Sequence, residues 1–128
     1  YATEGASGFD LRANLVEDLI VKPLERVAVP TGLFLEIPVG YEGQIRARSG
    51  MSLKHGITMA NGVGTIDSDY RGEIKVLIVN ISDKEYTIKN NDRIAQMIIA
   101  KYERADFKLV EELSDTSRDK GGFGHTGY

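Results

Sequence analysis

The chain has 128 residues, of which 41% are hydrophobic and 27% are charged, with a formal net charge of −3 and no cysteine. This length suits one domain with its own core, while disulfides and thiolate chemistry are excluded and the acidic balance argues against nucleic acid or an anionic membrane as partner. No apolar stretch approaches the ~20 residues of a membrane span and no charged-then-apolar leader is visible, so we expect a cytoplasmic protein.

Short apolar runs typical of β-strands follow one another along the chain. Turns rich in Gly, Pro and Asn separate them, and most runs alternate apolar with polar residues. The expected strands lie at 9–13, 19–21, 26–29, 29–38 (two runs around a Pro-Thr-Gly turn), 41–47, 74–81, 86–88, 93–102 and 107–110.

Some of these segments carry more detail. Residues 41–47 alternate, so Gly43 and Ile45 should share one face. The denser run 74–81 is expected to be buried on both faces. Residues 93–102 are long enough for a helix, but their Ile-Ile pair and the preceding Asn-Asn-Asp turn favour a strand.

The pattern as a whole indicates an all-β barrel or sandwich with at most one short helix, at 49–56. Residues 1–113 should form this one domain. The glycine-rich stretch 114–128, with its lone Phe123, should be a mobile tail in the free protein.

Common nucleotide and metal motifs do not fit. Residues 122–127 match G-x-G-x-x-G, but no strand precedes them and no helix follows to offer its N-terminus to a pyrophosphate. Residues 67–72 begin like a calcium loop, yet its twelfth position would be Ile78 instead of a glutamate. The two histidines are far apart and no cysteine joins them, so zinc is not expected.

A small group of polar segments remains as a candidate site. In "RSG", Arg48 supplies a bidentate cation, and Ser49 with the Gly50 amide supplies donors, which together suit a phosphate. The alternative is a surface arginine followed by a serine that caps the helix. Gln96 is an amide inside an apolar strand, where it either reaches a ligand or is a satisfied edge residue.

The stretch "NGVGTIDSDYRG" (61–72) carries the densest chemistry. Its Asn-Gly pair is a hairpin signal, and its glycines permit close approach of a ligand to the backbone. Asp67 could be a general base and Tyr70 a flat wall against a ring. The alternative is a hairpin whose acids only satisfy turn amides.

The tail offers a similar choice. "RDKGGFGHTG" (118–127) is either simple disorder or a lid that orders when Phe123 stacks on a bound ring and Arg118 reaches a phosphate.

Together these segments resemble the five motifs of the homotrimeric dUTPases (deoxyuridine triphosphate nucleotidohydrolases), in the same order and over nearly the whole chain. They are "ASGFDLRA" (6–13), "RSGMSLKHG" (48–56), "NGVGTIDSDYRGE" (61–73), "DRIAQMI" (92–98) and "RDKGGFGHTG" (118–127). Ala47 and Asp119 depart from the usual motif residues, proline and glycine.

The resemblance implies a distorted, jelly-roll-like β-barrel (β-clip) that assembles as a homotrimer with shared active sites. Motifs two and four of one subunit would hold the phosphates, motif three of a neighbour the nucleoside, and the tail of the third would close over both. The implied reaction converts dUTP and water to dUMP and pyrophosphate, which keeps uracil out of DNA and supplies dUMP for dTMP synthesis.

The resemblance also implies a role for each site residue. Asp67 would activate the attacking water, Tyr70 would pack on the deoxyribose, and Asp10 would contact Mg²⁺ through a water. The hairpin main chain and Asn61 would read uracil by hydrogen bonds, which reject a wrong base better than a size filter does. The remaining substrate contacts would be Arg48, Ser49, Gly50, Gly64, Thr65, Ile66, Lys75, Gln96, Arg118, Phe123 and Gly124, with Lys75 otherwise a solvated strand lysine.

Two rivals share this pattern in part. A dCTP deaminase has the same fold but needs a catalytic glutamate and lacks the Asp-x-x-Tyr pairing that Asp67 and Tyr70 form. A nucleotide-sensing regulatory module would use the same pocket without turnover, but no insertion interrupts the motifs.

Overall fold

The computed structural model describes residues 1–122, so the tail residues Phe123 and Gly124 lie outside the described part of the chain. It contains nine strands and one helix within this range. In chain order these are β1 (Phe9–Arg12), β2 (Leu19–Val21), β3 (Arg26–Pro30), β4 (Tyr41–Arg46), α1 (Ser49–His55), β5 (Ile57–Met59), β6 (Gly64–Ile66), β7 (Lys75–Asn80), β8 (Tyr86–Ile88) and β9 (Arg93–Lys101). The expected all-β fold with one short helix is confirmed.

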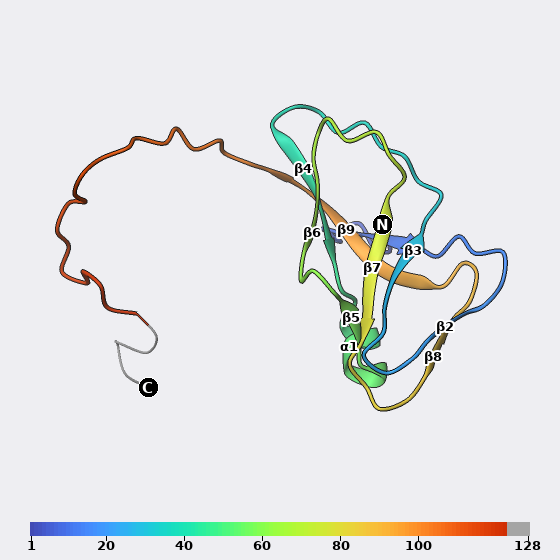
Figure 1. The fold of residues 1–128 in the computed structure, drawn as a ribbon. Coiled ribbons are helices and arrows are strands. Elements are labelled where there is room, and N and C mark those ends of the chain that lie inside the picture. The colour runs from blue at the N-terminus through green and yellow to red at the C-terminus, as the bar shows by residue number, and fades with distance from the viewer. Residues whose placement is uncertain (123–128) are drawn as a thin grey trace.

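The strands form three antiparallel sheets that face a common interior (Figure 1). The largest has the order β1-β9-β4-β6, a second has the order β3-β7-β5, and β2 pairs with β8 alone. The hydrogen-bond ladders of residues 1–122 do not close into one continuous barrel. A distorted barrel built from separate sheets is therefore the accurate description.

The long strand β9 organises the largest sheet. It pairs with β1 on one side and β4 on the other, with Asp10 opposite Gln96 and Arg46 also opposite Gln96. This confirms the choice of strand over helix for this segment. Because β9 lies between β1 and β4, Asp10 of motif one and Arg46 at the end of β4 lie on either side of Gln96.

One hydrophobic core lies between the sheets. Leu11, Ile45 and Met97 from the largest sheet are almost fully buried, as are Val76 and Ile78 from β7. Each such side chain contributes on the order of 1.5–3 kcal/mol relative to an exposed one. Gly43 and Ile45 do share the buried face of β4, as the alternation predicts.

Helix α1 has two turns and ends at Gly56. Gly56 adopts a left-handed conformation with φ of 66°, and its N–H bonds back to the carbonyl of Ser52. The basic residues Lys54 and His55 in the last turn suit the helix dipole. The N-cap is Arg48 and no side chain caps the helix, so the alternative role of Ser49 as a cap is wrong.

The second β-rich run of 29–38 is not a strand. Residues 31–38 are irregular and pair with no strand among the described residues, although Leu35 and Ile37 still face the core. The reason is that their polar groups bond to the loop before β7: the Leu33 carbonyl accepts from the Ile74 amide at 2.8 Å. This segment therefore fastens a loop instead of extending a sheet.

Two further expectations about local structure are wrong. β7 is not buried on both faces, because its side chains alternate and Leu77 is 40% exposed in the single chain. The Asn61-Gly62 turn does not close a hairpin ladder either. β5, before the turn, pairs with β7, whereas β6, after it, pairs with β4.

The expected strand at 107–110 is also absent. After β9 the chain leaves the body in a long arc (Figure 1), and Phe107 is 91% exposed. No strand of the same chain lies beside it among the described residues, so its apolar pattern finds no partner. No helix in residues 1–122 is long and apolar enough to cross a membrane.

Candidate active site

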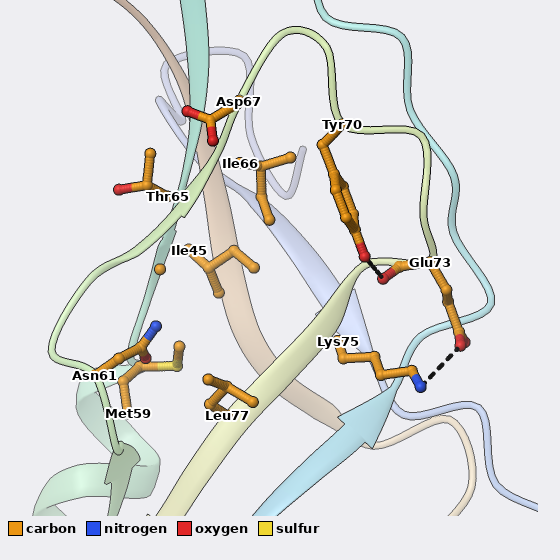
Figure 2. A pocket seen from close by; sticks show the side chains of 11 residues that line it. Ile45, Met59, Asn61, Thr65, Ile66, Asp67, Tyr70, Glu73, Lys75 and Leu77 are labelled. Atoms are coloured by element: carbon orange, nitrogen blue, oxygen red, sulfur yellow. Dashed lines mark hydrogen bonds and ion pairs between the residues drawn. The ribbon is translucent and has the colours of Figure 1, made fainter.

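A pocket of about 240 Å³ opens beside β6 and β7 (Figure 2). Its walls come from the end of β5, from β6 and the loop after it, and from the outer face of β7. It gathers most of the residues expected around a nucleoside. Its lining consists of Ile45, Met59, Asn61, Gly64, Thr65, Ile66, Asp67, Tyr70, Glu73, Lys75 and Leu77.

The Tyr70 ring forms one wall of this pocket, which we call the nucleoside pocket after the expectation for its residues. Its hydroxyl donates to the main-chain carbonyl of Glu73 at 3.0 Å, so the ring, not the hydroxyl, is what a ligand would meet. Gly72 makes this position possible, because a Cβ there would overlap the Tyr70 hydroxyl and ring. The glycine at the end of the motif thus sets the place of its aromatic residue.

Glu73 is the most connected residue of the pocket. Its side chain accepts a hydrogen bond from the Gly32 amide at 2.9 Å and pairs with the Lys75 ammonium at 3.8 Å. In Figure 2 the Glu73 carboxylate and the Lys75 ammonium lie next to each other on the same side as the Tyr70 hydroxyl. Lys75 is therefore paired, and it lines the pocket instead of standing alone in solvent.

The segment 31–36 holds the loop 67–74 from outside. The Thr31 hydroxyl donates to the Ile74 carbonyl at 2.6 Å, and Glu36 pairs with Arg71 at 3.6 Å. The Arg71 guanidinium also donates to the carbonyls of Ser68 and Tyr70. The loop thus gets its shape from side-chain bonds, since β6 and β7 are not paired with each other.

The Asp67 carboxylate is exposed at the rim of the pocket (Figure 2). Within residues 1–122 it makes no hydrogen bond or ion pair to the protein; the turn is closed instead by the Tyr70 amide bonding to the Asp67 carbonyl at 3.2 Å. A carboxylate that only satisfies turn amides would accept hydrogen bonds from those amides, and the Asp67 carboxylate accepts none within this range. The group is available to accept a proton from a water in the pocket.

A second pocket, of about 260 Å³, brings the expected phosphate residues together. Here the two guanidinium groups of Arg48 and Arg93 flank a single carboxylate, that of Asp10. We call it the phosphate pocket for the chemistry of its lining. It is lined by Ala2, Ala6, Gly8, Asp10, Arg48, Ser49, Gly50, Arg93 and Gln96.

Arg48 is fixed by contacts on two sides. Its Nε lies 3.3 Å from one Asp10 oxygen, and its Nη1 donates to the Arg93 carbonyl at 3.0 Å. The other Asp10 oxygen lies 3.4 Å from Arg93 Nη1. Two cations to one anion leave a positive balance that suits a bound polyphosphate.

Gln96 lies on the central strand β9, so the alternative of an edge residue is wrong. Its amide donates to the Ala47 carbonyl at 3.1 Å, which fixes the backbone just before Arg48. Gly8 faces it, and a Cβ there would come within 3.1 Å of Gln96 Oε1.

The two pockets share no lining residue. Ile66 pairs with Gly43, so Asp67 lies level with Glu42, whereas Arg48 follows the other end of the strand. Six residues of extended chain separate these levels, which amounts to roughly 20 Å. Asp67 and Arg48 of one chain therefore lie at different levels of β4 and line different pockets.

The tail residue Arg118 lies in neither pocket. It belongs to an exposed turn in which its Nε donates to the Gly121 carbonyl at 2.8 Å. The predicted contacts of Phe123 and Gly124 lie outside the described residues.

Two pocket residues were missed by the sequence reasoning. Arg93 stands three residues before Gln96 in the same motif. Its contact with Asp10 depends on the pairing of β1 with β9, which the sequence alone does not show. Glu73 ends the third motif directly before Ile74. Its role depends on Gly32 in the irregular segment 31–36, of which residues 31–32 were expected to form a turn and residues 33–36 part of a strand.

The donor set for a metal is sparse. No group of three or more His, Asp or Glu side chains in residues 1–122 is arranged to hold an ion. Asp10 offers one carboxylate, already shared by two arginines. These residues fit a hard cation such as Mg²⁺ that is held by substrate phosphates and keeps its waters.

The structure thus defines an antiparallel β protein with one pocket of apolar walls and polar groups and a separate cationic pocket. A family model described as dUTPase matches residues 1–127. The chain belongs to the dUTPase family.

Relatives and solved structures agree with this assignment. The chain is 62% identical over 128 residues to a deoxyuridine 5'-triphosphate nucleotidohydrolase of Finegoldia magna, covering all of this chain and 90% of that protein. The enzyme of the same name from Fusobacterium nucleatum is 57% identical, with 99% and 87% covered. A dUTPase of Staphylococcus bacteriophage 80alpha, solved with dUPNHPP, has a TM-score of 0.88 at 27% identity, with 98% and 89% covered.

Proposed function

We propose that the protein is a dUTP diphosphatase, which hydrolyses dUTP to dUMP and pyrophosphate. The observation that carries the proposal is the exposed, unengaged Asp67 carboxylate next to the Tyr70 ring, in a pocket formed by the motif typical of the family. The relatives named for this reaction match the chain nearly end to end.

The nucleoside pocket would take uracil and deoxyribose. Asn61 and the main chain of Gly64, Thr65 and Ile66 would read the polar edge of uracil. Tyr70 would lie against the sugar, where a 2′-hydroxyl would clash. Such hydrogen-bond readout can discriminate by ~10⁴-fold or more, because a wrong edge leaves polar groups unpaired.

The phosphate pocket would take the triphosphate. Arg48, Ser49, Gly50 and Gln96 would bind phosphate oxygens, and Arg93 adds a cation at the same place. When the triphosphate arrives, its oxygens would replace Asp10 as partner of the two guanidinium groups. Asp10 would then be free to bind a water of the metal ion.

The reaction needs one proton acceptor. Asp67 would take a proton from a water while the water oxygen bonds to the α-phosphorus, and the bond from that phosphorus to the α–β bridging oxygen breaks. Pyrophosphate leaves with the bonding electrons. A positioned base contributes ~10²–10⁴-fold, so orientation and charge neutralisation must supply the remainder. Mg²⁺, bound through the phosphates, would neutralise part of that charge.

We infer that the working enzyme is a homotrimer with shared sites. The separation of roughly 20 Å along β4 between the levels of Asp67 and Arg48 supports a site that a second copy completes. The region after β9, including the tail 114–128, would reach a neighbouring subunit and bring Arg118, Phe123 and Gly124 over the ligand. A domain at 1–113, a cytoplasmic location and the absence of a nucleic-acid partner stay predictions.

Substrate choice tests the activity directly. Pyrophosphate release should be fast with dUTP and Mg²⁺ and at least ~10³-fold slower in kcat/KM with dTTP, dCTP or UTP. Ammonia release from dCTP should be absent. Equal turnover of dCTP, or ammonia release, would contradict the proposal.

Asp67→Asn tests the base. The variant should bind a non-hydrolysable dUTP analogue as tightly as the wild type but lose ~10²–10⁴-fold in kcat. Asp69→Asn is the matched control, because Asp69 lies on the same loop but does not line the pocket. Normal turnover by Asp67→Asn would remove Asp67 from the mechanism.

Subunit mixing tests the shared site. Asp67→Asn and Arg48→Gln should each be inactive alone. When they are unfolded together and refolded at equal amounts, about a quarter of the sites should regain both wild-type residues if neighbours share a site. If each chain holds its own site, the mixture stays inactive, and the sharing is refuted.

A further inference from the structure

We propose that Glu73 is a positioning residue of the nucleoside pocket, which holds Lys75 and the Tyr70 ring in place through an anchor on Gly32. This inference rests on the proposed function, because it assumes that the pocket takes the nucleoside. It assigns a role to a residue that would not itself touch the reacting atoms.

Three contacts meet on this one residue. The Tyr70 hydroxyl donates to its main-chain carbonyl at 3.0 Å, the Gly32 amide donates to its Oε1 at 2.9 Å, and Lys75 Nζ lies 3.8 Å from its Oε2. Figure 2 shows the Tyr70 and Lys75 contacts meeting at Glu73 on one side of the pocket. Both pocket residues are thereby tied to the same point.

The anchor and the ion pair make different demands on the side chain. The Gly32 amide needs an oxygen acceptor, which glutamine also offers, whereas Lys75 needs a negative charge. The Glu73 side chain is 24% exposed and that of Lys75 is 53% exposed. Solvent therefore screens the ion pair, and most of the positioning should come from the anchor.

The anchor matters because nothing in the sheet holds this loop. β6 and β7 are not paired, so the loop between them depends on segment 31–36 for its place. Thr31 and Leu33 hold Ile74, the next residue, whereas the Gly32 bond is the contact of this segment with Glu73 itself. Without the Gly32 bond, Glu73 is held less tightly, and so is the Tyr70 hydroxyl that donates to its carbonyl. The ring wall that meets the sugar would then lose its fixed position.

A purely structural role predicts something different, and Glu36 provides the comparison. Glu36 joins the same two segments through its pair with Arg71 at 3.6 Å, but it does not line the pocket, and its side chain is 83% exposed. If Glu73 only fastened the loop, Glu36→Ala would affect the enzyme in the same way. If Glu73 positions pocket residues, only its own replacement alters substrate recognition.

The experiment compares three variants, Glu73→Ala, Glu73→Gln and Glu36→Ala, by steady-state kinetics with dUTP and UTP and by dUMP binding. Glu73→Ala should raise KM for dUTP about tenfold with a smaller change in kcat, and should weaken the preference for dUTP over UTP. Glu73→Gln should recover most of that loss and stay within about fivefold of wild type, as expected for a screened pair. Glu36→Ala should match wild type in all three measurements.

A Lys75→Met background isolates the ion pair. There Glu73→Gln should have no further effect, because the charge it removes has lost its partner. Equal KM and equal dUTP preference in Glu73→Ala and wild type would overturn the inference, as would an identical loss in Glu36→Ala. Binding of dUMP by the wild type separates failure of the proposed function from failure of this inference. If the wild type does not bind dUMP, the proposed function fails. If the wild type binds dUMP and Glu73→Ala binds it equally well, only the inference about Glu73 fails.

Discussion

Gly72→Ala should damage substrate recognition far more than stability. A Cβ at Gly72 would overlap the Tyr70 hydroxyl and part of its ring, so the ring has to leave its present position. Gly72 does not have a positive φ, so alanine itself can adopt the local backbone. The substitution therefore acts on the Tyr70 ring and not on the backbone.

The structure limits the cost to folding. Moving the ring breaks the 3.0 Å hydrogen bond from Tyr70 to the Glu73 carbonyl, a net loss of about 0.5–1.5 kcal/mol. Alanine returns about 0.4–1 kcal/mol by restricting the unfolded chain. Since the Tyr70 residue is already 43% exposed, the ring can swing into solvent without leaving a cavity. The melting temperature should fall by less than about 4 °C.

The effect on binding is larger. If a deoxyribose covers about 50 Å² of the ring, losing that contact costs about 1.3 kcal/mol, or about tenfold in KM for dUTP. Pyrophosphate release gives KM and kcat, and thermal melting gives stability. Gly5→Ala is the control, because a Cβ at Gly5 meets nothing within 4 Å and its φ is not positive.

A double-mutant cycle isolates the cause. In a Tyr70→Ala background there is no ring to displace, so Gly72→Ala should add nothing to the rise in KM. Additive effects of the two substitutions, or an unchanged KM in Gly72→Ala alone, would refute the role assigned to this glycine.

Other measurements probe other parts of the chain. Deleting residues 118–128 should abolish most activity while leaving thermal stability nearly unchanged, and full activity after deletion would refute the lid. Arg93→Gln should weaken binding of a dUTP analogue about tenfold and should hardly change binding of dUMP. Arg12→Gln is the control, because Arg12 pairs with Arg93 across the strands but lies outside the phosphate pocket. Equal losses of affinity for both ligands would contradict a phosphate contact by Arg93. Burial, and to a lesser degree the Asp92 charge, raises the pKa of Tyr86 from its ordinary value of 10.0. A raised pKa in the folded state stabilises the fold below the unfolded-state pKa, and this stability is lost as the pH rises through the folded-state pKa. In denaturant melts above pH 10, the free energy of unfolding should therefore fall more steeply for wild type than for Tyr86→Phe.

Strands with a clear alternation were predictable from sequence because their burial follows the two-residue period. β4 is the best example, and its start is correct to the residue. The start of β9 is also correct, but its Ile-Ile pair and the turn before it gave that prediction. Residues 33–38 have the same kind of pattern and are not a strand. Alternation reports which side chains face the core, as Leu35 and Ile37 do, but not whether the backbone finds a strand to pair with.

The sequence identified the residues that line the candidate site, but not the residues that hold them in place. Tyr70 and Lys75 belong to a recognisable motif, whereas the residues that hold them, Gly32 and Glu73, come together only through the contact of two distant loops. A hydrogen bond from a main-chain amide leaves no mark on composition or periodicity. Such contacts are therefore missed by any reading of local pattern.

The absent strand at 107–110 and the proposed shared site both bear on the association of copies of this chain. Phe107 and Leu109 repeat an apolar alternation with nothing in their own chain to cover it, and Leu77 leaves an apolar opening on the outer face of β7. An apolar run that extends away from its own body costs free energy unless another surface buries it. The register of β4 independently separates Asp67 from the Arg48 pocket by roughly 20 Å. A neighbouring copy that covers residues 107–110 would remove the cost of their exposure, and in the proposed homotrimer a neighbouring copy would also bring its Arg48 to the Asp67 pocket.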